Sequence, residues 1–106
     1  GDLKVSDEVK KEIREIYKSE WAGKDGLTVH KIDDVYWIYY CNRNSKKDAD
    51  ISIGLEGSKL VMNCYDSAKS LFDIEPFCWK LFAVKSPVEI EQVEITTGDQ
   101  RQIAIV

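Results

Sequence analysis

Residues 35–41 read Val-Tyr-Trp-Ile-Tyr-Tyr-Cys, an unbroken run of apolar and aromatic side chains. These residue types favour β-strands, and successive side chains of a strand point to opposite faces of its sheet. Both faces of this strand are therefore apolar. Such a pattern predicts a central strand that other parts of the chain cover on both sides.

The residues before this run predict a helix and one further strand. Ser6 is a suitable N-cap, and acidic residues follow it at the positive end of the helix dipole. Gly23 can take the left-handed conformation that ends a helix. Residues 27–32 then form a strand candidate, and Asp33-Asp34 form a turn into residues 35–41. The apolar face of the helix is built from Val9, Ile13, Ile16 and Tyr17.

The residues after the run predict further strands. A polar loop covers residues 42–50, and residues 51–65 form a hairpin around Gly57-Ser58. Residues 66–73 predict a short second helix, with a bulged crossing loop as the alternative. The last strand candidates are residues 77–84, residues 88–95 with a β-bulge near Glu91-Gln92, and residues 100–106, which we expect to be paired inside the sheet.

This order of elements predicts the α+β class. An N-terminal helix packs on a mostly antiparallel sheet of six to seven strands, as a roll or half-barrel, because the connections are too short for helical crossovers. A chain of 106 residues supports a single domain over residues 1–106. Since the chain opens on Gly1-Asp2 and not on Met, residues 1–5 are interpreted as flexible or as added before the native sequence.

Composition excludes several classes of function. The chain carries 15 basic and 19 acidic residues, a net charge of −4, which argues against a general nucleic-acid binder. No apolar run approaches the length of a membrane span. Metal-ligating residues are scattered, so neither a metal site nor a cofactor is predicted. Cys41, Cys64 and Cys78 form no C-x-x-C pair, and we interpret them as buried thiols of a cytoplasmic protein.

The sequence offers no clear catalytic residue. His30 lies mid-strand near Asp33 and Asp34, and pairing with a thiol would be the sharpest enzyme hypothesis. A single histidine in a strand is more often satisfied by one structural hydrogen bond. The prediction is therefore that the chain is not an enzyme.

Two features suggest a surface for a partner. Glu89, Glu91 and Glu94 are expected on one exposed strand face, where they would attract a basic partner. Their alternative role is to discourage edge pairing between sheets. Tyr36 and Tyr40 belong to a surplus of aromatic residues that resembles an interface, although packing on two faces of the core explains them as well.

We therefore expect a non-catalytic protein-binding domain, in its most specific form a small acidic inhibitor or immunity-type protein. The expected partner is another protein, basic in charge, and neither a nucleic acid nor a membrane; a homodimer stays open. The alternatives are a small-molecule-binding α+β cup and a structural domain excised from a larger chain.

Overall fold

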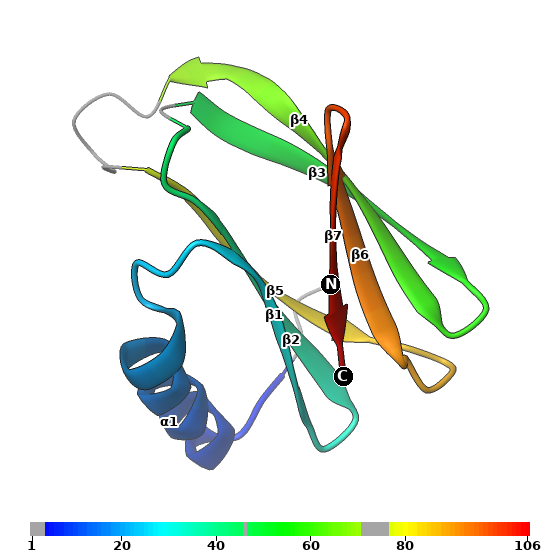
Figure 1. The fold of residues 1–106 in the computed structure, drawn as a ribbon. Coiled ribbons are helices and arrows are strands. Elements are labelled where there is room, and N and C mark those ends of the chain that lie inside the picture. The colour runs from blue at the N-terminus through cyan, green and yellow to red at the C-terminus, as the bar shows by residue number, and fades with distance from the viewer. Residues whose placement is uncertain (1–3, 46, 71–76) are drawn as a thin grey trace.

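The computed structural model describes residues 4–45, 47–70 and 77–106, in which an N-terminal helix packs against one of two β-sheets (Figure 1). Helix α1 (Asp7–Ile16) continues directly into a short π-helix, η1 (Tyr17–Trp21). This arrangement confirms the α+β class. The strands are β1 (Gly26–Ile32), β2 (Val35–Asn42), β3 (Lys47–Glu56), β4 (Lys59–Ser70), β5 (Cys78–Lys85), β6 (Gln92–Thr97) and β7 (Gln100–Ile105).

The helix begins and ends where the sequence predicts. Ser6 Oγ accepts a hydrogen bond from the Val9 N–H at 3.2 Å, which caps the first turn. After the π-helical turn, Gly23 takes a φ of 73°, a left-handed conformation that costs glycine little. The π-helical turn itself has no signal in the sequence. It ends on Trp21, whose side chain is buried against the sheet.

The first sheet has the order β1-β2-β5, and both pairs are antiparallel. The central position predicted for residues 35–41 is therefore confirmed. The β1–β2 hairpin turns at Asp33, which has a φ of 56°. Aspartate tolerates this left-handed conformation better than most non-glycine residues do.

The second sheet has the order β3-β4-β6-β7. The β3–β4 hairpin and the β6–β7 hairpin are antiparallel, but β4 pairs with β6 in parallel. The prediction of a mostly antiparallel arrangement is therefore confirmed, and β4–β6 is the one parallel pair among the described strands. Between β4 and β6 the chain crosses to the first sheet and forms β5, and it therefore returns to the second sheet in the direction of β4.

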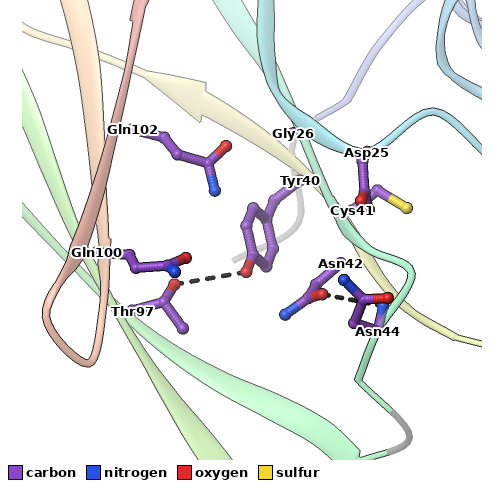
Figure 2. A pocket seen from close by; sticks show the side chains of 9 residues that line it. All are labelled: Asp25, Gly26, Tyr40, Cys41, Asn42, Asn44, Thr97, Gln100 and Gln102. Carbon is purple, nitrogen blue, oxygen red and sulfur yellow. Dashed lines mark hydrogen bonds between the residues drawn. The ribbon is translucent and has the colours of Figure 1, made fainter.

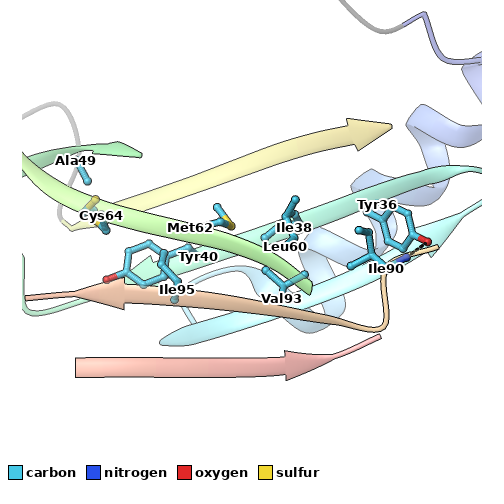
Figure 3. Packing of buried hydrophobic residues seen from close by; sticks show 11 residues of the cluster. Tyr36, Ile38, Tyr40, Ala49, Leu60, Met62, Cys64, Ile90, Val93 and Ile95 are labelled. Atoms are coloured by element: carbon cyan, nitrogen blue, oxygen red, sulfur yellow. Dashed lines mark hydrogen bonds between the residues drawn. The ribbon is translucent and has the colours of Figure 1, made fainter. Parts of the chain in front are cut away.

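Strand β2 is covered on both faces, as its sequence predicts. Toward the second sheet, Tyr36, Ile38 and Tyr40 join a core cluster with residues of β4 and β6, among them Met62 and Ile95 (Figure 3). Toward the helix, Tyr39 and Cys41 pack with Ile13 and Trp21. The molecule thus has three layers: the helix, the three-stranded sheet and the four-stranded sheet.

Three local expectations were wrong. Residues 66–70 extend β4 instead of forming a helix, while residues 71–73 lie outside the described part of the chain. Strand β3 begins at Lys47, inside the predicted loop. Residues 88–91 do not form a regular strand with residues 93–95, because the backbone N–H of Ile90 bonds to Tyr36 Oη instead of to a neighbouring strand.

Strand β7 presents its polar side to the interior. Its register pairs Gln102 with the buried Ile95, so Gln102 faces the first sheet, whereas Ile103 pairs with Glu94 on the outer face. Ile103 is 53% exposed and Ile105 is 72% exposed. We expected residues 100–106 to be paired inside the sheet. Instead, β7 is an edge strand, and among the described strands it pairs only with β6.

Candidate functional site

Tyr36 and Tyr40, two of the predicted partner-binding residues, lie in the core. Each is 2% exposed. Tyr36 Oη accepts a hydrogen bond from the Ile90 N–H at 2.8 Å, and Tyr40 Oη lies 3.4 Å from Thr97 Oγ1. Tyr36 therefore positions Ile90, and neither tyrosine ring is presented to a partner.

Glu94 is also buried. Its side chain is 9% exposed and lies on the outer face of β6, 3.4 Å from Arg101 Nε and 3.8 Å from Lys59 Nζ. A buried carboxylate needs such partners, because burial removes its hydration. The structure therefore does not bring Glu94 onto one exposed strand face with Glu89 and Glu91.

Glu89 and Glu91 are exposed and flank a buried anchor, Ile90. Ile90 is 1% exposed, and its N–H is held by the Tyr36 hydroxyl. On the far side, Glu91 accepts a hydrogen bond from Ser58 Oγ at 3.0 Å, and its N–H donates to the Ser58 carbonyl at 2.8 Å. The backbone of the β5–β6 connection is thus fixed to both sheets. The Glu91 carboxylate is held by Ser58, and the Glu89 carboxylate projects into solvent near Lys31.

These two residues belong to a larger acidic surface, which we call the acidic end. The β5–β6 connection lies between the β1–β2 turn, which contacts it through Lys31 and Glu89, and the β3–β4 turn, which contacts it through Ser58 and Glu91 (Figure 1). The exposed carboxylates of the acidic end are those of Asp33, Asp34, Glu56, Glu89 and Glu91. Its lysines are fewer: Lys31 lies 3.7 Å from Glu89, Lys85 lies 3.2 Å from Asp34, and Lys59 pairs with Glu94.

An apolar groove of about 190 Å³ adjoins the acidic end. It lies between the free edge of β3 and the last residues of β5. Ile53 and Leu55 on its β3 side are 43% and 42% exposed, although both point to the inner face of the sheet. Pro87 lines this groove and also a neighbouring hollow that contains Glu89. The groove and the acidic end therefore form one continuous surface.

His30 occupies the helix-facing side of β1. Its Nε2 lies 2.6 Å from Glu20 Oε2, and its ring meets Trp21 edge-on with centroids 5.6 Å apart. Both partners come from the π-helical turn, so His30 connects this turn to the sheet. The sequence pattern favoured a histidine that makes one structural hydrogen bond, and His30 makes such a bond to Glu20.

On the same side of the sheet, burial raises the pKa of the Tyr39 hydroxyl and the pKa of the Cys41 thiol. All three cysteines are buried free thiols. A buried thiol with a raised pKa is a poor nucleophile, because the thiolate is the reactive form. The geometry of Cys41 therefore fits packing better than covalent chemistry.

These shifts predict that the free energy of unfolding falls as the pH rises above about 9. In the unfolded chain the thiol and the phenol ionise near 9.0 and 10.0, whereas in the folded chain they remain neutral to higher pH. Their contribution is thus complete at neutral pH and is lost toward alkaline pH. Urea unfolding between pH 7 and pH 11 measures this slope. Tyr39→Phe should flatten it, and Tyr65→Phe at an exposed position should not; equal slopes in all three proteins contradict the prediction.

A second pocket lies at the opposite end of the strands, with a volume of about 250 Å³. We call it the amide pocket because four of its side chains are amides (Figure 2). This pocket was not expected from the sequence. In the sequence, Gln100 and Gln102 lie on one face of the last strand, and Ile103 and Ile105 lie on the other. This pattern suggests that the isoleucines face inward, whereas in the structure the glutamines do. The lining residues are Asp25, Gly26, Tyr40, Cys41, Asn42, Asn44, Thr97, Gln100 and Gln102.

In the described ranges, three or more histidine, cysteine or acidic residues never come together as a metal site. Within the same ranges, none of the helices has the length and apolar character needed to cross a membrane. Comparisons with protein-family models, with curated proteins and with solved structures find no match to this chain. Its function is therefore argued from its own residues.

Proposed function

We propose that this chain is a non-catalytic protein-binding domain that docks a basic partner through its acidic end. The observation that carries the proposal is the fixed backbone of the connection, which places Glu89 and Glu91 at the surface on either side of the buried Ile90. The Glu91 carboxylate is also held by Ser58, and a side chain that is held in place loses little conformational freedom on binding. The attraction of Glu91 to a cationic surface is therefore little offset by the ordering of its side chain.

The local charge favours a basic partner. Of the five exposed carboxylates of the acidic end, Asp34 and Glu89 lie within ion-pair distance of a lysine. Both of these pairs are exposed, and exposed ion pairs contribute little to stability, so they can be exchanged for pairs with a partner. A surface of one sign also accelerates the encounter with an oppositely charged protein.

The apolar groove supplies an apolar centre for the interface, which the charged residues do not provide. Interfaces combine a desolvated apolar centre with a polar rim, and most of their binding energy comes from a few anchor residues near the centre. Ile53, Leu55 and Pro87 provide such a centre beside the acidic end. The partner we propose therefore places an apolar side chain in the groove and basic side chains against Glu89 and Glu91.

In its most specific form, the proposal is a small inhibitor or immunity-type protein that covers a basic site of an effector. Free thiols at all three cysteines suit a reducing compartment, and we place the interaction in the cytoplasm. Glu94 takes no direct part, because Lys59 and Arg101 already neutralise it. Tyr36 acts as a positioning residue through its hydrogen bond to Ile90.

The proposal predicts that charge reversal at the connection abolishes capture of the partner. Three forms of the chain serve as bait in a lysate of the source organism: the native chain, E89K/E91K, and E12K/E15K on the exposed face of α1. The two variants change the net charge equally. Washing at about 50 mM and then at about 500 mM salt separates charge-dependent binding from other binding, and quantitative mass spectrometry identifies the released proteins.

We expect one basic protein, in stoichiometric amount, on the native chain and on E12K/E15K, with release at high salt. E89K/E91K should retain less than about a tenth of it, which corresponds to about 1.4 kcal/mol of binding free energy. Equal recovery on all three baits would show that net charge, and not the acidic end, determines binding. Recovery of no protein on any bait would also count against the proposal.

A further inference from the structure

The amide pocket offers hydrogen-bonding groups of both kinds but little charge. Its lining contains the side-chain amides of Asn42, Asn44, Gln100 and Gln102, together with two hydroxyls, and neither lysine nor arginine. An amide side chain both donates and accepts hydrogen bonds. The one carboxylate, Asp25, already accepts a hydrogen bond from the Arg43 N–H at 2.6 Å. A neutral ligand with many donors and acceptors matches this lining better than an anion or a cation does.

The orientation of Asn42 is fixed by its neighbour. Asn42 Oδ1 accepts a hydrogen bond from the backbone N–H of Asn44 at 3.1 Å. Since only the oxygen of an amide can accept, this bond determines which side of the group carries the nitrogen. Figure 2 shows the nitrogen of Asn42 directed into the pocket, toward Tyr40 and Thr97. The Asn42 side chain also bonds to the Tyr40 hydroxyl, so the pocket has a positioned donor that a ligand would share with Tyr40.

The two hydroxyls retain capacity for a ligand. Tyr40 Oη and Thr97 Oγ1 lie 3.4 Å apart, beyond the usual range of about 2.5–3.0 Å for a bond between two hydroxyls. The contact between them is weak, so a ligand hydroxyl loses little by replacing it. The Tyr40 phenol is protonated at neutral pH and can donate, and burial raises its pKa further.

Gln100 and Gln102 complete the lining from β7. They point toward the first sheet, and in the described part of the chain their amides have no hydrogen-bond partner. Because side chains alternate along a strand, this orientation places Ile103 and Ile105 on the exposed outer face of β7. The stability of the fold would be greater with the opposite face of β7 inward, because the isoleucines would then be buried and the glutamines would be in water. Gln100 is exposed at the rim, whereas Gln102 is half-buried, so the orientation of Gln102 points to a use other than stability.

We propose that the amide pocket binds a neutral, hydroxyl-rich small molecule of the size of one monosaccharide. Its surface is mostly polar, so a flat nucleobase would gain little from stacking there. Its volume of about 250 Å³ lies just below the range of about 300–1,000 Å³ that is typical of pockets for drug-sized ligands. This site lies at the opposite end of the strands from the acidic end, and its occupancy does not depend on the proposed protein partner.

Side-chain amide resonances of the ¹⁵N-labelled protein test this site directly, because the four amides are themselves the lining. The probes are glucose, galactose and N-acetylglucosamine, each titrated to about 50 mM, since dissociation constants near 1 mM are usual for ligands this small. Inorganic phosphate and adenosine serve as charged and flat comparison probes. The variants are Q102A and Q100A, and the matched control is Q92A on the outer face of β6.

We expect one of the three sugars to shift the side-chain amides of Asn42, Gln100 and Gln102 in a saturable manner. Q102A should then weaken binding about tenfold, the scale of one lost hydrogen bond to a ligand, and Q92A should leave it unchanged. Absence of saturable shifts with all three sugars would overturn the proposal. Stronger binding of phosphate or of adenosine than of every sugar would overturn it as well, as would equal affinity in Q102A and the native chain.

Discussion

Trp21→Ala is expected to lower the free energy of unfolding by about 3–5 kcal/mol, the usual range for removing a buried large aromatic side chain. Trp21 is 1% exposed, and its ring stacks on Tyr39 at 5.6 Å with an interplanar angle of 2°. It joins the π-helical turn to the sheet, and removing it leaves a cavity between these two layers. Urea unfolding followed by circular dichroism measures the change.

Trp21→Phe separates packing from hydrogen bonding. The indole Nε1 of Trp21 is buried and has no hydrogen-bond partner in the described part of the chain, so phenylalanine loses no such bond. We expect this variant to lose less than half of the free energy that alanine loses. A loss below about 1 kcal/mol for Trp21→Ala is the scale of a surface substitution and would contradict the packing described here.

Ile90→Ala is the second substitution with a large expected effect. It should lower the free energy of unfolding by about 2–5 kcal/mol. Ile90 is 1% exposed and belongs to the core between the two sheets. It also anchors the connection that carries Glu89 and Glu91. The variant should therefore weaken partner binding in addition to lowering stability, although it removes no charge.

Val88→Ala is the control in the same connection, because Val88 is 45% exposed. Its expected loss of stability is within about 0.5 kcal/mol, as for other surface positions. Thermal or urea unfolding of both variants, under conditions where each remains folded, gives the comparison. Equal losses at the two positions would mean that Ile90 is not the anchor of the connection.

The fold class could be predicted because local patterns and tertiary packing agree in the helix and in β2. Ser6 caps the helix as expected, and the two apolar faces of residues 35–41 find two covering layers. The parallel pairing of β4 with β6 could not be predicted, since the choice of sheet for β5 depends on contacts far apart in the chain. The extension of β4 over residues 66–70 likewise follows from pairing with β3, not from local propensity.

The candidate site could be predicted only in part. Glu89 and Glu91 are exposed, as their charge suggests, but Glu94 is enclosed by Lys59 and Arg101, which come from neighbouring strands. Alternation alone cannot reveal such partners. The amide pocket was missed for a related reason: its residues come from β1, β2, β6, β7 and the segments beside them, and only the register of the sheets brings them together.

The most direct test of the central claim is the rate of association with the captured partner at low and high salt. At about 20 mM salt, E89K/E91K should associate at least about tenfold more slowly than the native chain, and E12K/E15K should match the native rate. Raising the salt to about 500 mM should slow the native chain and bring the three rates together. Equal rates at low salt for the native chain and E89K/E91K would contradict docking through the acidic end.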